Sequence, residues 1–191
     1  MNTESISTAS FVRSSVIIRS GIDKYCEMIS LYDHGKGCGD ARFQRLYTYF
    51  YRVRRSAAWL GAYYNLMGEL SQMPDTPFSE CLRLTDAIDG SGVEVSFASK
   101  MFHTLNPDMP IWDSQVKKSL GLGDVPMNGA REEREGAAVA LYSELRDRFA
   151  GLLALESVRK EIKEFDRLLP EYADKVSATK KLDFLLWSAG R

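Results

Sequence analysis

The residue of this sequence best suited to chemistry is an aspartate at the expected start of a helix. Asp113 belongs to the segment PIWDS, residues 110–114, which follows a proline-broken apolar helix and precedes a basic one. Aspartate is a favoured N-cap, because its carboxylate accepts hydrogen bonds from free N–H groups of the first turn. A carboxylate held in a partly dry site can also stabilise positive charge that develops during a reaction. The two roles do not exclude each other, and both stay open at this point.

Basic and aromatic residues gather in an earlier segment. Six basic residues stand between Lys36 and Arg55 against one acid, although the net charge of the chain is −1. Such a patch can bind phosphates, and the expected contacts are Arg52, Arg54 and Arg55. Flat rings can stack on a nucleic-acid base, and the candidates are Tyr47, Tyr51, Trp59, Tyr63, Tyr64 and Trp112. The alternative for the rings is a packed core, and for the arginines a solvated face.

The elements that must position these residues are expected to be helices. Apolar residues recur at helical spacing, and neither an alternating strand pattern nor a repeat is present. Ser56 is expected to cap a helix, and the glycines of residues 33–40 indicate a loop. The predicted helices cover residues 11–32, 41–55, 57–72, 78–88, 93–105, 114–122, 131–155, 156–170 and 179–189. The predicted fold class is all-α, in a single domain spanning 1–191.

Residues 87–113 resemble one family. Ile88-Asp89-Gly90-Ser91-Gly92 is similar to the Leu-Pro-Gly-apolar-Gly hairpin of the helix-hairpin-helix DNA glycosylase superfamily, and Asp113 matches the catalytic aspartate of that family. Bifunctional members carry a lysine two positions after the second hairpin glycine. The equivalent residue here is Glu94, 19 positions before Asp113, and this separation agrees with the family pattern.

The resemblance implies a two-lobed all-helical domain that excises a base from DNA. Asp113 is then the catalytic carboxylate of a monofunctional N-glycosylase that leaves an abasic site, and Glu94 in place of lysine argues against a covalent lyase step. The base would be flipped into an aromatic pocket that includes Glu94, and the hairpin backbone would meet a phosphate through Gly90, Ser91, Gly92 and Val93. The substrate would be a damaged base, or a modified base in foreign phage DNA. Asp89 and Ser91 depart from the family pattern, and a carboxylate at Asp89 would repel a phosphate.

The amino-acid composition limits the classes of protein to which this chain can belong. The chain has 191 residues, 45% hydrophobic and 27% charged, which is typical of a globular domain. No apolar run is long enough to span a membrane, so we expect a cytoplasmic monomer that binds DNA and no membrane. Three scattered cysteines and two histidines argue against a disulfide framework or a metal centre, and the expected mechanism needs no cofactor. The alternative function is a catalytically inactive nucleic-acid-binding or helical protein-interaction module.

Overall fold

Helices are the regular secondary structure in the part of the chain that the structure describes, and loops connect them. The computed structural model describes residues 7, 16–90 and 92–190, and no strand occurs within them. The all-α prediction is therefore confirmed. In chain order the elements are α2 (Val16–Tyr32), η2 (Asp33–Gly39), α3 (Ala41–Phe50), α4 (Ala57–Leu70), α5 (Phe78–Asp86), α6 (Val95–Leu105), α7 (Ser114–Leu120), α8 (Arg131–Ala154), α9 (Glu156–Leu168), η3 (Pro170–Tyr172) and α10 (Ala178–Ala189).

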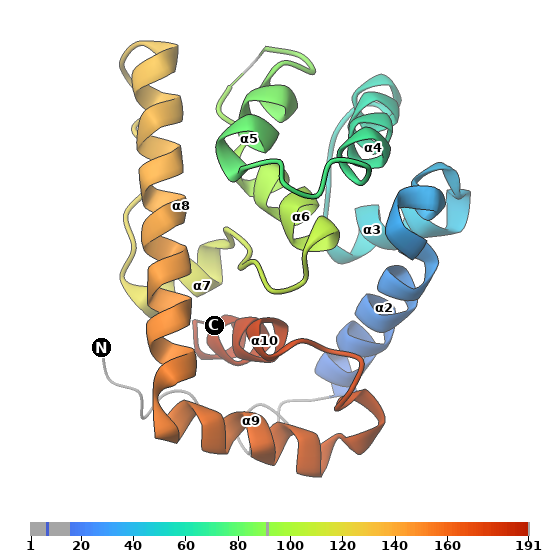
Figure 1. Cartoon of the computed structure of the whole chain (residues 1–191), viewed down its shortest axis with the longest axis vertical. Coiled ribbons are helices and arrows are strands. Elements are labelled where there is room, and N and C mark those ends of the chain that lie inside the picture. The colour runs from blue at the N-terminus through green and yellow to red at the C-terminus, as the bar shows by residue number, and fades with distance from the viewer. Residues whose placement is uncertain (1–6, 8–15, 91, 191) are drawn as a thin grey trace.

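Helix α10 lies inside a corner made by two other helices. The long helix α8 runs along one edge of the molecule, and α9 turns across its end (Figure 1). Helix α10 packs on α7, α8 and α9. On another side, Phe184 of α10 meets the ring of Tyr25 of α2 edge to face. The last helix therefore joins elements from the two ends of the chain.

Polar caps fix where several helices begin. Ser56 Oγ accepts a hydrogen bond of 3.2 Å from the N–H of Trp59 at the start of α4, which confirms the predicted cap. Asp113 Oδ1 accepts one of 2.8 Å from the N–H of Gln115 at the start of α7. Asp40 caps α3 in a similar way. Local side-chain chemistry thus sets these three helix starts, whereas the helix predicted for residues 41–55 was wrong at its other end, because α3 ends at Phe50.

The glycine-rich stretch of residues 33–40 differs from its prediction. It was expected to be a loop, and Asp33–Gly39 instead forms the 3₁₀ helix η2. Gly37 lies so close to the backbone of Leu31 that a Cβ atom would clash with the Leu31 carbonyl group. Gly35 has a φ of +88°, a conformation that favours glycine. These glycines permit close packing of the backbone, and that is why the prediction of a loop was wrong.

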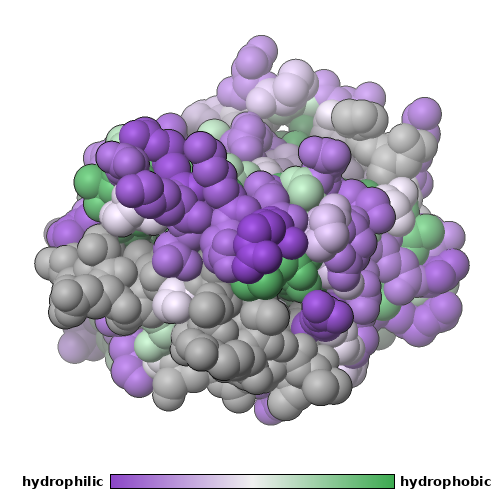
Figure 2. All heavy atoms as spheres, turned by 90° about the horizontal axis from the view of Figure 1, so that it is seen from below, coloured by the Kyte–Doolittle hydropathy of each residue, from purple (hydrophilic) through white to green (hydrophobic). Residues whose placement is uncertain are grey.

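The surface on the α9 side is mainly hydrophilic (Figure 2). Helix α9 buries Val158 and Phe165, and its outer positions carry ion pairs such as Lys160 with Glu156. Among the described helices, none combines the length and apolar character needed to cross a bilayer.

Candidate functional site

A cavity of about 1240 Å³ lies between helices that are far apart in sequence. Its walls come from α2, the end of α3, α6, the start of α7 and α10, which surround the centre of the view in Figure 1. Basic side chains outnumber carboxylates on these walls. The charged residues that line the cavity are Lys24, Arg52, Arg54, Lys100, Asp113, Lys180 and Asp183. A cavity of this size and charge can take an anionic ligand as large as a nucleotide.

Asp113 caps α7 and lines the cavity at the same time. Its loop is held on both sides. The N–H of Trp112 donates a hydrogen bond of 2.9 Å to Ser99 Oγ, and Tyr142 donates one of 2.9 Å to the carbonyl of Pro110. Both roles considered for Asp113 are therefore compatible with its position, because a carboxylate has two oxygens and the cap uses one of them.

Lys100 of α6 lines the same cavity as Asp113. Its ammonium group donates a hydrogen bond of 3.0 Å to Ser96 Oγ and lies 5.2 Å from the ring centroid of Phe97. Burial lowers the pKa of Lys100, and the negative charge of Asp113 opposes this shift. The two groups therefore interact electrostatically across the cavity wall.

A buried ion pair on α10 forms another part of the wall. Lys180 is 2% exposed and Asp183 is 6% exposed, and Lys180 Nζ donates a hydrogen bond of 2.6 Å to Asp183 Oδ2. The ammonium lies 4.7 Å from the ring centroid of Phe184 and 5.1 Å from that of Tyr25. Burial raises the pKa of Asp183, the charge and hydrogen bond of Lys180 oppose that shift, and the charge of Asp113 adds to it.

Three residues that the sequence analysis singled out lie at this cavity with Asp113. They are Tyr51, Arg52 and Arg54, which lie just after the end of α3. Arg52 has a φ of +51°, which is unusual for a residue other than glycine. The structure thus brings the basic segment and the aspartate together across about sixty positions of sequence.

Six other predicted pocket residues do not line this cavity, and they are Tyr47, Trp59, Tyr63, Tyr64, Trp112 and Glu94. Tyr47 is fully buried and shares a hydrogen bond of 2.7 Å with Tyr63, and Trp59 stacks on Tyr63 with ring centroids 4.9 Å apart. Trp112 is 4% exposed, and Lys117 Nζ lies 4.9 Å from its ring centroid. Glu94 forms an ion pair with Arg55. Tyr47 is buried in α3, and Trp59 and Tyr63 are buried in α4, so helical spacing places these three rings on core-facing sides of their helices.

The predicted hairpin forms a turn between α5 and α6. Gly90 has a φ of +69°, and Asp86 Oδ1 accepts a hydrogen bond of 2.6 Å from the N–H of Glu94. Gly92 and Val93 complete the turn, and Ser91 lies outside the described residues. These residues do not line the cavity, so a phosphate contact by the hairpin backbone stays a prediction.

Arg55 ties this turn to the start of α4. Its guanidinium forms ion pairs with Glu94 and, at 3.8 Å, with Asp89. The guanidinium carbon also lies 5.1 Å from the ring centroid of Phe97. The charge of Arg55 is therefore balanced by hairpin carboxylates in this structure, and its predicted contact with DNA stays a prediction.

Three charged residues of this wall were not predicted from the sequence as site residues, and they are Lys100, Lys180 and Asp183. A usable signal was present in the last helix, where charged residues interrupt an otherwise apolar run. All positions from Thr179 to Leu186 are buried in α10. Charged side chains are seldom fully buried unless they are paired, so a buried charged run marks candidates for a site.

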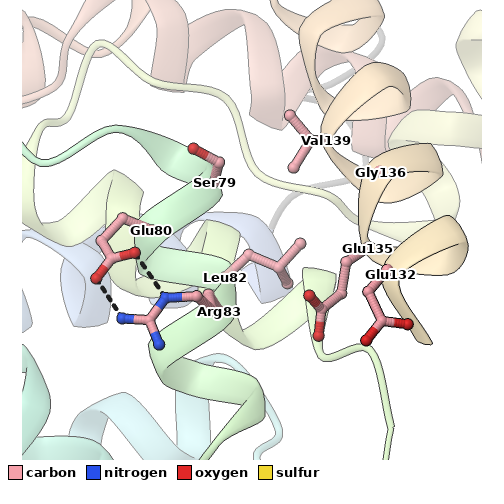
Figure 3. A pocket seen from close by; sticks show the side chains of 8 residues that line it. All are labelled: Ser79, Glu80, Leu82, Arg83, Glu132, Glu135, Gly136 and Val139. Carbon is pink, nitrogen blue, oxygen red and sulfur yellow. Dashed lines mark hydrogen bonds and ion pairs between the residues drawn. The ribbon is translucent and has the colours of Figure 1, made fainter.

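A smaller hollow of about 360 Å³ lies between α5 and α8. Figure 3 shows Glu80 and Arg83 paired beside Leu82, with Glu132 and Glu135 on the facing helix. Arg83 donates two hydrogen bonds to Glu80, and both side chains are exposed. Exposed pairs of this kind are ordinary features of a protein surface, so the cavity at Asp113 is the better candidate site.

No protein-family model, curated protein or solved structure matches this chain.

Proposed function

We propose that the protein is a monofunctional DNA N-glycosylase of the helix-hairpin-helix type, with the two lobes of that fold on either side of the cavity. One observation carries the proposal. Asp113, the carboxylate that the sequence resemblance singles out, lines a cavity that is large enough for a flipped nucleotide and rich in basic side chains.

The cavity supplies groups for each part of such a substrate. Arg52, Arg54 and Lys24 are suited to the phosphates beside the flipped nucleotide. The rings of Tyr51 and Trp187 are suited to contact with the base. Lys100 adds a positive charge close to Asp113, and the negative charge of Asp113 opposes the lowering of the Lys100 pKa by burial.

In the proposed reaction the bond between the base nitrogen and C1′ of deoxyribose breaks, and its electron pair leaves with the base. The sugar becomes an oxocarbenium ion, which the carboxylate of Asp113 stabilises. A water molecule adds to C1′ and gives its proton to Asp113. The departing base takes up a proton from solvent, Asp113 releases its proton to solvent, and an abasic site remains. The half-buried position of Asp113 favours this role, because electrostatic stabilisation is stronger where water is partly excluded.

The test is abasic-site formation on a panel of DNAs with alkylated, oxidised, deaminated and phage-type hypermodified bases. Strand scission after mild alkali reports the product. Asp113→Asn should reduce the rate roughly 10²–10⁴-fold, the usual contribution of a general base. Asparagine is an equally good N-cap, so this variant should keep its melting temperature.

A matched control is Asp40→Asn, because Asp40 caps α3 and is exposed, with no place in the cavity wall. It should leave the rate unchanged. Salt-dependent DNA binding by the wild type, without scission of any DNA in the panel, would overturn the proposal in favour of an inactive nucleic-acid-binding module. Absence of both activities would favour a helical protein-interaction module.

A further inference from the structure

The ion pair between Lys180 and Asp183 is almost fully buried. A buried ion pair of this kind is not expected to add much to the stability of the fold. Both side chains are at least nine-tenths buried, and both line the cavity. Removing two charges from water is costly, and replacement of such a pair by apolar residues is often neutral or stabilising. Charged groups with perturbed environments in a cavity are candidates for functional sites. The position of the pair therefore points to a ligand.

One oxygen of Asp183 has no partner within the described residues. Oδ2 accepts the hydrogen bond from Lys180, whereas Oδ1 is buried and accepts none. A buried acceptor without a partner is unfavourable, and most such groups in proteins are satisfied. Since Asp183 lines the cavity, a bound molecule with a hydrogen-bond donor would satisfy Oδ1.

Flat rings line the same cavity as Asp183. Phe50, Tyr51, Phe184 and Trp187 all line the cavity with Asp183. Aromatic rings stack on planar heterocycles. Burial raises the pKa of Asp183, and the charge and hydrogen bond of Lys180 oppose that shift. A carboxylate paired with an ammonium group in this way acts as an acceptor only. The chemistry selects a planar ligand that carries a donor on its edge.

We propose that Asp183 is a specificity-determining residue, whose Oδ1 accepts a hydrogen bond from an N–H group on the edge of a nucleobase bound in the cavity. The inference that the base is part of DNA rests on the proposed function. The inference that its N–H edge is recognised does not. Lys180 is a positioning residue, because it holds Asp183 Oδ2 and its charge. Methylation of the N–H group removes the donor and adds bulk, so a methylated base is rejected.

The test compares free bases with their N-methylated counterparts by isothermal titration calorimetry of the whole chain. The probes are uracil with 3-methyluracil, adenine with N6,N6-dimethyladenine, and hypoxanthine with 1-methylhypoxanthine. We expect the wild type to bind at least one N–H base about tenfold or more tightly than the methylated form, as a hydrogen bond to a charged group implies. Asp183→Asn should bind that base about tenfold more weakly, with the preference for the N–H form lost.

Asp166→Asn is the matched control. Asp166 of α9 forms an ion pair of 2.5 Å with Lys181 of α10, away from the cavity wall. This variant should keep both the affinity and the preference. Failure of every base to bind the wild type would overturn the inference, and so would an unchanged preference in Asp183→Asn.

Asp183→Asn leaves Lys180 buried without its counter-charge and can fail to fold for that reason. A double variant provides a second test in that case. Lys180→Met with Asp183→Leu removes the whole pair, so it should fold and should still lose base binding. Wild-type binding by this double variant would contradict the inference. Because free bases need no bond cleavage, these titrations are independent of the abasic-site assay. Base selection by Asp183 without scission would refute only the glycosylase, and scission with unaltered selection in Asp183→Asn would refute only the role of Asp183.

Discussion

The hydroxyl group of Tyr142 donates a hydrogen bond of 2.9 Å to the carbonyl oxygen of Pro110, and so helix α8 holds the loop that ends at Asp113. The ring of Tyr142 stacks on Phe78, with centroids 3.6 Å apart. The tyrosine is 1% exposed, so the carbonyl that it binds has little access to water. The long helix therefore supports the candidate site although none of its residues lines the cavity.

Tyr142→Phe should loosen this loop while the ring packing remains. We expect the free energy of unfolding to fall by about 1–3 kcal/mol, because a buried carbonyl loses its donor. The rate of base excision should fall by more than the small fraction of unfolded protein would cause, because Asp113 is held less firmly in the variant. Tyr172→Phe is the control: it loses a hydrogen bond of 2.6 Å to Asp23 outside the cavity wall and should leave excision unchanged. Equal losses of activity in both variants would argue against support of Asp113 by α8.

Arg52 stands where the end of α3 favours glycine. The N–H of Val53 donates to the carbonyl of Thr48, and that of Arg52 to Tyr49, which is the hydrogen-bond pattern of a helix C-terminus closed by a left-handed residue. Arg52→Gly should therefore raise the free energy of unfolding by about 1 kcal/mol, because the left-handed strain is relieved. It should also weaken DNA binding and reduce its salt dependence, since one cation is lost.

Arg52→Ala separates these two effects. It removes the same charge and keeps the left-handed strain, so DNA binding should weaken without a gain in stability. Chemical denaturation and binding titrations at several salt concentrations measure both quantities. If Arg52→Ala raised the free energy of unfolding as much as Arg52→Gly does, left-handed strain at this position would be refuted.

Asp86 should make the protein less stable as the pH rises. The residue is fully buried, and burial raises its pKa to about 6, against the opposing hydrogen bond from the Glu94 N–H. The folded state thus binds a proton more tightly than the unfolded state does, and stability falls between about pH 4 and pH 6. Asp86→Asn should be more stable than the wild type above pH 6 by on the order of 2–3 kcal/mol. This advantage should vanish near pH 4, and a pH-independent difference in denaturation midpoints would contradict the assignment.

His103 should make the protein less stable as the pH falls, which is the opposite of the effect of Asp86. Nδ1 donates a hydrogen bond of 2.6 Å to the carbonyl of Met109, which only accepts, so Nε2 accepts the 3.0 Å hydrogen bond from Tyr25. Burial lowers the pKa of His103 to about 3, with a further contribution from the charge of Lys180. Only the unfolded state takes up a proton as the pH falls below about 6.5, so the stability contributed by neutral His103 is lost between about pH 6.5 and pH 3. Nitrogen-15 chemical shifts of this imidazole should stay at their neutral values from pH 7 to pH 5, and a midpoint within that range would overturn the prediction.

The close packing of η2 makes Gly37 sensitive to a single methyl group. Gly37→Ala places a Cβ atom against the Leu31 carbonyl group and should lower the free energy of unfolding by about 1–3 kcal/mol, the usual range for overpacking. Gly39→Ala is the control within the same element, because no atom lies within 4 Å of its added Cβ. Thermal denaturation distinguishes the two variants, and equal melting temperatures would refute the packing role of Gly37.

The helices and several of their starts could be predicted from the order of residues alone. Ser56 and Asp113 start helices as predicted, because a cap bonds N–H groups only two or three residues away. The same local chemistry placed Asp113 at a helix start. It did not reveal that η2 forms from a glycine-rich stretch, because that depends on packing against Leu31.

Only the tertiary structure decided which side chains meet. Tyr47 and Tyr51 lie one helical turn apart, yet one is in the core and the other also lines the cavity. Lys180 and Asp183 reach the wall opposite Asp113 because α10 packs inside the corner of α8 and α9. Helical periodicity repeats every 3.6 residues and defines faces of one helix. It carries no information on the direction in which that helix packs against others, which depends on the shape of the whole core.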